Sequence, residues 1–334
     1  MAIELIVIEN SMKQQILIIG AGAVGQVYAY HFAKAGHQVH LLLKPKYIES
    51  AQQGFVLYDL KQDKSRQQAI DFKNFTCHST WASVAQQPID QVWLCMSSVA
   101  LAQLDFAAMK QAIGQATVVV LQPDPSDVER VQQALGAEQV VAGMINMISY
   151  YAPLAGEKVP KEGVAFWIPP IVPMPVDGAK SRLQGVLTLL KSAKIAATGQ
   201  ANFAAKNAHN SSFLMVFLAA LELSNWQFDT LASNKNLLKT MLQAQHEVFA
   251  ALSAEYGTQP SYGLTMIKSW MIPVILKVAR HIAPLNMEVY MQAHFLKVRE
   301  QTLVLLQAYQ QRAQQHQLPH EGLAGLITRL IEKD

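Results

Sequence analysis

The sequence contains only two cysteines, Cys77 and Cys95, among 334 residues. Two cysteines cannot form the disulfide framework that stabilises small secreted domains, and no cysteine–histidine cluster has metal-ligand spacing. His316 and His320 lie four residues apart, but Pro319 between them favours a solvated loop over a metal site. We therefore expect no bound metal ion and a cytoplasmic location.

Long apolar runs are missing as well. A membrane-spanning helix needs roughly 18 or more consecutive apolar residues, and no such run occurs. The nearest candidate, residues 213–223, is interrupted by Glu222, which is typical of a buried or interface helix. The first residues lack the basic region, apolar core and cleavage site of a secretory signal. We therefore expect no membrane partner.

Neither positive nor negative charge predominates in the sequence. Lysine and arginine number 27 and aspartate and glutamate 24, so the formal net charge is only +3. The basic residues are scattered, which argues against a nucleic-acid partner. Hydrophobic residues make up 51% of the chain, enough for sizeable cores. At roughly 100–200 residues per domain, the length suggests about two domains.

What the sequence does contain is a glycine-rich turn. Residues 15–25 read Gln-Ile-Leu-Ile-Ile-Gly-Ala-Gly-Ala-Val-Gly, an apolar strand followed by glycines with Gly-x-Gly-x-x-Gly spacing, and an amphipathic helix is expected over residues 26–35. Such glycines allow a tight turn, backbone approach to a pyrophosphate, and close packing of the next helix. The N-terminus of that helix favours negative charge. This motif predicts a dinucleotide site formed by Gly20, Ala21, Gly22, Ala23, Val24 and Gly25.

The first part of the chain alternates short apolar strands with helical stretches, which predicts a parallel sheet with helices on both faces. The expected strands are residues 15–19, 38–43, 91–95, 117–121 and 139–143. Residues 54–60 and 69–75 flank a polar stretch and predict a β-hairpin. The proline-rich segment 163–177 predicts edge structure with a turn at Asp177-Gly178, ahead of a helix over residues 180–192.

Strand signals end near residue 200, and amphipathic helical patterns follow. The expected helices are residues 203–223, 236–255, 287–315 and 323–332. The third is predicted as one helix because it contains no glycine or proline. The fold class is therefore α/β, with an N-terminal Rossmann doubly wound sheet over residues 12–198 and a C-terminal all-helical domain over residues 199–334. Apolar helices such as 213–223 could pair with a second copy, and a homodimer is the commonest such assembly.

The end of the second strand predicts which dinucleotide binds. A carboxylate there pairs with a free ribose hydroxyl, whereas a basic side chain accommodates a 2′-phosphate. The strand ends in Leu43-Lys44-Pro45-Lys46, with two lysines and no carboxylate. Ordinary loop lysines are the alternative interpretation, but the pattern favours NADP(H) as cofactor, with Lys44 at the phosphate.

Together these features resemble the ketopantoate reductase (2-dehydropantoate 2-reductase) family. The resemblance rests on the glycine turn, the following Rossmann domain, the all-helical second domain, and Lys206 with Asn210 at the start of its first long helix. It runs from about Met12 to the C-terminus. It implies acid catalysis by Lys206, because negative charge builds on the substrate oxygen when a ketone accepts a hydride. It also implies that Asn210, one helical turn later, positions the substrate. A solvated lysine near a helix start is the alternative.

The sequence departs from the family pattern at three places. Ser97-Ser98 stand where a lysine commonly follows the fourth strand, and Gln122-Pro123 stand where Asn-Gly commonly follows the fifth. A glutamate on the late helix is replaced by Gln301. The resemblance therefore makes Ser97, Gln122 and Gln301 the candidate contacts to the cofactor. We expect the three departures to affect specificity for ketopantoate more than binding of the cofactor.

Polar residues on the helix expected over residues 287–315 could compensate for these departures from the family pattern. His294, Lys297 and Gln301 are spaced to share one face of a continuous helix, with Tyr290 one turn earlier. Lys297 could pair with a substrate carboxylate, and His294 could donate a hydrogen bond or a proton. A solvated polar face is the alternative interpretation.

The function predicted from the sequence is NADPH-dependent reduction of a small 2-oxo acid, such as 2-dehydropantoate to pantoate in pantothenate biosynthesis. The lost asparagine and glutamate motivate two alternatives: reduction of a different keto acid, or a non-catalytic NADP-binding sensor derived from the family. A further alternative is an enzyme that joins amino acids to keto acids reductively. A requirement for an amine co-substrate would identify it.

Overall fold

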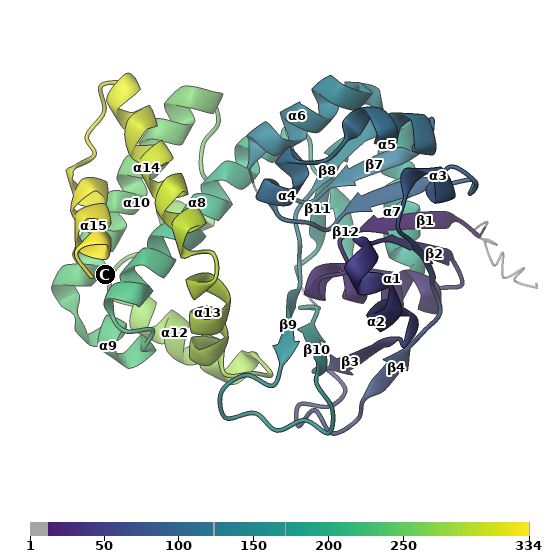
Figure 1. Ribbon diagram of the computed structural model, residues 1–334. Coiled ribbons are helices and arrows are strands. Elements are labelled where there is room, and N and C mark those ends of the chain that lie inside the picture. The colour runs from purple at the N-terminus through teal and green to yellow at the C-terminus, as the bar shows by residue number, and fades with distance from the viewer. Residues whose placement is uncertain (1–12, 123, 171, 334) are drawn as a thin grey trace, which may run out of the picture. The chain divides into compact units, whose positions relative to one another are not determined.

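The structure, a computed structural model, describes residues 13–122, 124–170 and 172–333 (Figure 1). The chain divides into two compact units. The first comprises the residues up to Leu57, Ile70–Ser149 and Ile168–Ala201, and the second comprises Tyr58–Ala69, Tyr150–Trp167 and the residues from Asn202 onward. The last boundary lies between Ala201 and Asn202. The grouping of the excursions 58–69 and 150–167 with the helical unit is not predicted by the sequence.

The first unit contains an eight-stranded sheet with the order β12-β11-β8-β7-β6-β1-β2-β5. Its strands are β1 (Gln15–Ile19), β2 (Gln38–Leu42), β5 (Thr76–His78), β6 (Gln91–Leu94), β7 (Thr117–Val120), β8 (Val140–Gly143), β11 (Met174–Gly178) and β12 (Ala197–Gly199). Six strands that are neighbours in the sheet pair in parallel: β8, β7, β6, β1, β2 and β5. The Rossmann prediction is confirmed.

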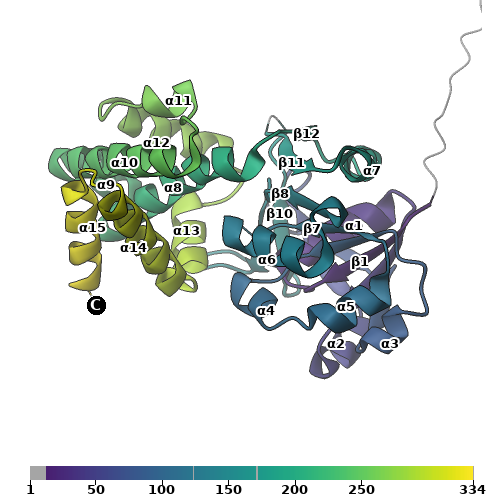
Figure 2. The ribbon, with the colours of Figure 1, turned by 90° about the horizontal axis from the view of Figure 1, so that it is seen from above.

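Helices cover both faces of this sheet. Helices α1 (Ala23–Lys34) and α7 (Lys180–Ser192) contact each other, whereas α5 (Phe106–Ile113) contacts α6 (Pro125–Leu135) and α3 (Trp81–Val84) (Figure 2). The ring centroids of Tyr28 and Phe32 on α1 lie 5.0 and 4.9 Å from that of Trp93 on β6. All three rings are fully buried. This aromatic cluster anchors α1 to the sheet.

The strand register aligns the carboxyl ends of four neighbouring strands. Ile19 at the end of β1 pairs with Leu42 of β2 and Leu94 of β6, and Leu94 pairs with Val120 of β7. The loops that follow these strands therefore begin at one edge of the sheet. This edge is where ligands bind in open α/β sheets.

The proline-rich segment is placed differently from its prediction. It contains β10 (Gly163–Trp167), which joins a second sheet with the order β4-β3-β10-β9, and then β11. The other strands of that sheet are β3 (Phe55–Asp59), β4 (Ile70–Phe72) and β9 (Ile148–Ala152), and the antiparallel pairing of β3 with β4 confirms the predicted hairpin.

Strand β11 is not edge structure, because it lies between β8 and β12. Asp177 and Gly178 belong to this strand and pair with β8, so the predicted turn there is wrong. Pro175 has no N–H to donate, but it stands second in the strand, before the residues Val176–Gly178 that pair with β8, and its carbonyl oxygen still accepts a hydrogen bond from the Met144 N–H at 3.2 Å.

The second unit is built mainly from helices. These are α8 (Phe203–Leu223), α9 (Phe228–Ser233), α10 (Lys235–Tyr256), α11 (Tyr262–Thr265), α12 (Met271–Ile282), α13 (Met287–Leu296), α14 (Arg299–Gln315) and α15 (Glu321–Ile331). Helix α10 packs against α8, α14 and α15 around an apolar core. The buried Glu247 carboxylate on α10 accepts hydrogen bonds from the backbone N–H groups of Gly322 and Leu323, at 3.0 and 2.8 Å. It thereby caps the N-terminus of α15.

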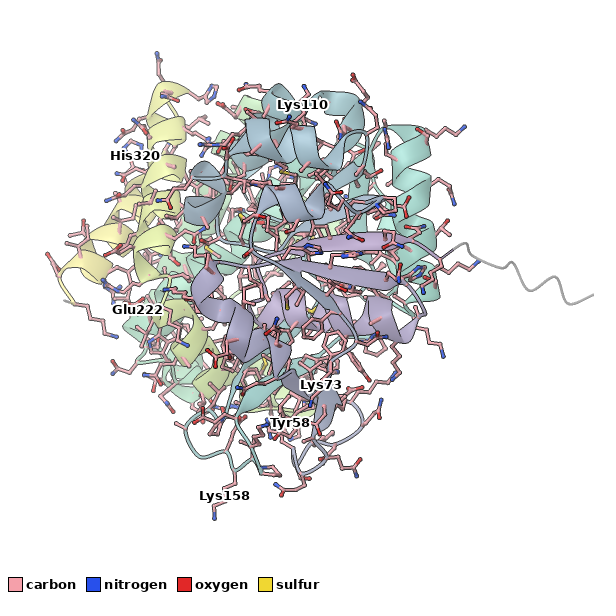
Figure 3. All side chains as sticks on the ribbon, turned by 45° about the vertical axis from the view of Figure 1, so that its right-hand side comes forward. Tyr58, Lys73, Lys110, Lys158, Glu222 and His320 are labelled. Carbon is pink, nitrogen blue, oxygen red and sulfur yellow. The ribbon has the colours of Figure 1, made fainter. Side chains whose placement is uncertain are left out.

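The single helix expected over residues 287–315 is wrong. Helix α13 ends at Leu296 and α14 begins at Arg299, although no glycine or proline separates them. The break has a tertiary cause. The Arg299 guanidinium pairs with Glu222 on α8 at 2.6 Å and donates to the Leu330 carbonyl oxygen at 2.7 Å (Glu222 is labelled in Figure 3). These contacts align α14 with α8 and α15, and the continuous helical face expected for His294, Lys297 and Gln301 is lost.

The described residues include no helix that is both long enough and apolar enough to cross a membrane.

Two buried histidines connect β2 to β5 in the first unit. The Nδ1 of His40 lies 3.0 Å from the Nε2 of His78, and the Nε2 of His40 lies 2.8 Å from the Gln15 Oε1. Because the amide oxygen only accepts, His40 donates from Nε2 and accepts at Nδ1 from His78. Both hydrogen bonds of His40 therefore form while the two imidazoles are neutral. Burial, with a smaller contribution from His78, lowers the pKa of His40 to about 4.

We expect this pair to make the fold acid-sensitive. The unfolded chain binds protons at His40 below pH ~6.5, whereas the folded chain does not until pH falls to about 4, so stability decreases as pH falls through this window. The loss of stability reaches up to about 3 kcal/mol for His40.

Denaturant unfolding across this pH range should show a shallower pH dependence of stability in His40→Gln than in the wild type. His246→Gln, at an exposed histidine, is the control and should keep the wild-type slope. Parallel curves for wild type and His40→Gln would contradict the assignment.

Candidate functional site

The glycine turn follows β1 at the carboxyl edge of the sheet. Gly20 has a φ of +98°, and a Cβ there would lie 2.7 Å from the Cys95 carbonyl oxygen. A Cβ on Gly25 would lie 2.0 Å from the Gly20 carbonyl oxygen. Neither position can hold a side chain without moving the backbone. The first and third glycines are therefore required by the turn itself.

Gly22 differs from the other two glycines because it faces open space. It is exposed, and a Cβ built on it would meet no atom within 4 Å. Gly22 is the N-cap of α1, which begins at Ala23, three residues earlier than expected. The N–H groups of Ala23 and Val24 lie in the first turn, where a helix offers no acceptor of its own. The turn thus fits an anion such as a pyrophosphate.

The loop after the neighbouring strand β2 supplies the basic side chains. Lys44 is exposed and precedes the short 3₁₀ turn Pro45–Tyr47. The Lys46 Nζ lies over the Tyr47 ring, 4.8 Å from its centroid, so its cation already has an aromatic contact. Of the two lysines, Lys44 is the nearer to the end of β2, the strand beside the glycine turn, and stands two residues after its last residue, Leu42.

The loop after β6 contains Ser97, and the end of β7 is followed by Gln122. Ser97 is the N-cap of α4 (Ser98–Ala102), and its hydroxyl accepts a hydrogen bond from the Ala100 N–H at 3.3 Å. Gln122 is buried, and its Nε2 donates to the carbonyl oxygens of Leu94 and Met96 at 3.1 and 2.7 Å. Both donors of Gln122 are therefore used within the protein. A direct contact of Gln122 with the cofactor stays a prediction.

Lys206 and Asn210 lie on α8 in the second unit. Both side chains are exposed and stand one turn apart, so they share a face of the helix. The Lys206 N–H donates to the carbonyl oxygen of the N-cap residue Asn202 at 3.1 Å. Asn202 has a φ of +57°, a conformation that asparagine tolerates better than most residues. The expected pairing of Lys206 and Asn210 on one helical face is confirmed, and their chemical roles stay predictions.

The other three candidate residues of this unit are divided between elements. His294 lies on α13, Lys297 is the C-cap residue that follows α13, and Gln301 lies in the first turn of α14. The imidazole of His294 stacks on the Tyr290 ring with centroids 5.4 Å apart. Desolvation, with a smaller contribution from the Lys297 charge, lowers the pKa of His294. His294 is therefore neutral near pH 7.

Sequence reasoning missed a polar cluster that supports Tyr290. The guanidinium of Arg66 pairs with Glu157 at 2.7 Å and donates to the Tyr150 hydroxyl at 3.0 Å, and the Tyr150 ring lies 5.7 Å from the Tyr290 ring. The Tyr58 hydroxyl donates to the Lys161 carbonyl oxygen at 2.6 Å and also links the two excursions (Tyr58 is labelled in Figure 3). No local sequence pattern signals contacts between segments so far apart in the chain.

Among residues 13–122, 124–170 and 172–333, no group of three or more histidine, cysteine, aspartate or glutamate side chains is arranged to hold a metal ion.

Comparison with known protein families gives a match for part of the chain. Residues 16–153 match the family described as ketopantoate reductase PanE/ApbA, which confirms the resemblance predicted from the sequence. No curated protein sequence matches the chain.

Several solved structures share the fold over nearly the whole chain. A PanE/ApbA family ketopantoate reductase from Ralstonia eutropha JMP134 is 18% identical, with a TM-score of 0.68, and the match covers 95% of this chain and 97% of that one. A 2-dehydropantoate 2-reductase from Geobacter metallireducens GS-15 is 15% identical, with a TM-score of 0.69 and coverage of 96% and 100%. A D-mandelate dehydrogenase solved with NADH and anilino(oxo)acetate is 9% identical, with a TM-score of 0.69 and coverage of 96% and 98%.

Proposed function

Because residues 16–153 match the ketopantoate reductase family, we propose that this chain is an NADPH-dependent reductase of a small 2-oxo acid. The observation that carries the proposal is the glycine turn at the start of α1, where Gly22 leaves open space and Gly20 and Gly25 are required by the backbone. This turn fits a pyrophosphate through the N–H groups of the first helical turn. A bound reduced nicotinamide would supply the hydride for carbonyl reduction.

The proposed choice of NADP(H) over NAD(H) rests on Lys44. Its exposed ammonium follows β2, the strand beside the glycine turn, where a basic group recognises a 2′-phosphate. The sequence from Leu43 to Ile48 contains no carboxylate that would repel the phosphate.

The proposed catalytic acid is Lys206. As a ketone becomes an alcohol, its carbon gains a hydride and its oxygen gains a proton. The Lys206 ammonium stabilises the developing negative charge and donates this proton. Asn210, on the same face of α8, hydrogen-bonds and positions the substrate.

The substrate is proposed at the level of a chemical class. The similar structures include 2-dehydropantoate 2-reductases and a D-mandelate dehydrogenase complexed with an oxo acid, so a 2-oxo acid is the shared element. Conversion of 2-dehydropantoate to pantoate is the specific form of the proposal. A non-catalytic NADP-binding sensor is the alternative, favoured by the engagement of both Gln122 donors within the protein.

The proposal is tested by titrating the protein with NADPH and NADH and then following NADPH oxidation with a panel of 2-oxo acids. We expect NADPH to bind more tightly than NADH and to be oxidised by at least one 2-oxo acid. Binding without turnover would support the sensor. Absence of binding would contradict both functions.

Substitution of Lys44 tests the cofactor preference separately. Lys44→Ala should weaken NADPH binding about tenfold, or about 1.4 kcal/mol, and leave NADH binding nearly unchanged. Lys46→Ala is the matched control, because Lys46 stands two residues away and lies over the Tyr47 ring. Equal effects of the two substitutions on NADPH affinity would assign the preference to general positive charge and not to Lys44.

A further inference from the structure

Helix α12 of the second unit carries apolar side chains on two of its sides (Figure 1). On one side, Ile272 and Leu276 are buried in the apolar core of the unit. A helix that is apolar on more than one side is normally covered on each of them. On the other side, however, five large apolar side chains are exposed, and we call this set the α12 stripe: Trp270, Val274, Ile275, Val278 and Ile282.

Charged contacts fix the orientation of α12 in its unit. The Arg280 guanidinium pairs with Asp229 on α9 and with Glu288 on α13, both at 2.9 Å, and lies over the Phe228 ring at 5.4 Å from its centroid. Glu288 also accepts a hydrogen bond from the Phe228 N–H at 2.6 Å. Rotation of the α12 stripe into the core would break these contacts. The stripe is therefore a preformed surface.

The size of the α12 stripe matches one side of a protein–protein interface. With 69% of Trp270 and 62% of Ile282 exposed, the five side chains together expose roughly 500 Å² of apolar surface. One partner in a standard interface contributes roughly 800 Å², of which roughly three-fifths is apolar. The stripe supplies about this apolar share. An exposed tryptophan such as Trp270 is also typical of the residues that carry most of the binding energy.

The charges near the α12 stripe distinguish between possible partners. Residues 257–287 contain no aspartate or glutamate, and Arg280 is already paired with two carboxylates. In this stretch of the described chain, Lys268 and Lys277 are the lysine or arginine side chains outside an ion pair. An anionic membrane surface is usually recognised by clusters of roughly four to eight basic residues. An uncharged apolar stripe instead fits a partner surface of the same kind.

We propose that the α12 stripe is the interface of a homodimer, in which α12 of one copy packs antiparallel against α12 of a second copy. A two-fold interface must fit itself, because both copies offer the same residues. Four members of the stripe stand four residues apart and form the kind of ridge that most often packs two helices together. Antiparallel packing places Trp270 opposite Ile282 of the second copy and Val274 opposite Val278. The bulkier side chains then lie at both ends and the smaller ones in the middle.

This surface differs from the one that the sequence suggested for a second copy. Residues 213–223 form the last part of α8, where Val216 and residues 218–221 are buried in the core of their own unit. The apolar character of that stretch is therefore explained by packing within one chain. The proposed dimer also requires neither cofactor nor substrate, so it is independent of the proposed function.

Sedimentation velocity of the full-length protein at micromolar concentrations tests the proposal. We expect the wild type to sediment with twice the mass of one chain. Val274→Asp should raise the dissociation constant of the dimer at least about 100-fold, because it buries an unpaired charge in the interface. Trp270→Ala should raise this constant at least about tenfold. Circular dichroism should show an unchanged fold in both variants, since both side chains are exposed in one copy.

Val304→Asp is the matched control. Val304 lies on α14 of the same unit and is 62% exposed, compared with 58% for Val274. The two substitutions therefore add the same charge at equally exposed valines. Val304→Asp should leave the dissociation constant of the dimer at the wild-type value.

Crosslinking tests the antiparallel arrangement. Trp270→Cys and Ile282→Cys proteins are oxidised with copper–phenanthroline, which joins two nearby thiols as a disulfide. We expect a covalent dimer when the two variants are mixed and none from either variant alone. The wild type, which has only Cys77 and Cys95, measures the background. A covalent dimer from either single variant alone would overturn the antiparallel arrangement.

A monomeric wild type would overturn the proposed dimer, as would equal effects of Val274→Asp and Val304→Asp on dimerisation. Vesicles of equimolar phosphatidylcholine and phosphatidylglycerol test the other occupant. Binding of a monomeric wild type to these vesicles, lost in Val274→Asp, would assign the α12 stripe to a lipid surface and overturn the dimer. If Val274→Asp does not fold, Trp270→Ala decides the question against the same control.

Discussion

Gly22→Ala is expected to weaken NADPH binding at least tenfold while leaving the melting temperature within about 2 °C of the wild type. The added methyl group meets no protein atom within 4 Å, so the fold has no steric reason to change. The same methyl group occupies the space through which the backbone approaches a pyrophosphate. The measurements are NADPH titration by fluorescence and thermal unfolding by circular dichroism.

Gly25→Ala is the contrasting variant. Its methyl group would lie 2.0 Å from the Gly20 carbonyl oxygen, so α1 must shift on the sheet. We expect this substitution to destabilise the fold by about 1–3 kcal/mol, as overpacking usually does. Unaltered NADPH affinity in a folded Gly22→Ala protein would show that the turn does not bind the pyrophosphate.

Lys206→Ala is expected to reduce kcat for 2-oxo acid reduction about 10²–10³-fold without changing the affinity for NADPH. The loss arises because the developing charge on the substrate oxygen is no longer stabilised and no acid supplies its proton. Asn210→Ala should mainly raise the KM for the 2-oxo acid, since Asn210 is assigned to positioning. Steady-state kinetics with the best substrate of the panel, and NADPH titration of each variant, measure these effects.

Lys235→Ala is a suitable control for Lys206→Ala. Lys235 is likewise exposed and opens the long helix α10 of the same unit, so its removal changes the net charge equally. Its kcat should stay at the wild-type value. Comparable kcat values for Lys206→Ala and Lys235→Ala would remove Lys206 from the mechanism.

The sequence by itself determined the elements whose signals are local. The strand β1, the glycine turn and the bounds of α7 and α8 follow from apolar periodicity and from backbone conformations that only glycine adopts readily. Each of these signals lies within about 20 neighbouring residues. The order of strands and helices therefore predicted a Rossmann unit followed by a helical one, and it placed Lys206 and Asn210 on one helical face.

The tertiary structure decided what depends on residues far apart in the chain. Glu222 and Leu330 bind Arg299 and so interrupt a segment whose own sequence favours one continuous helix. Gln122 reads as a candidate cofactor contact in the sequence, but the carbonyl oxygens of Leu94 and Met96 take both of its donors. Hydrogen bonds and ion pairs of this kind override local preference, because a buried polar group must find a partner wherever the fold provides one.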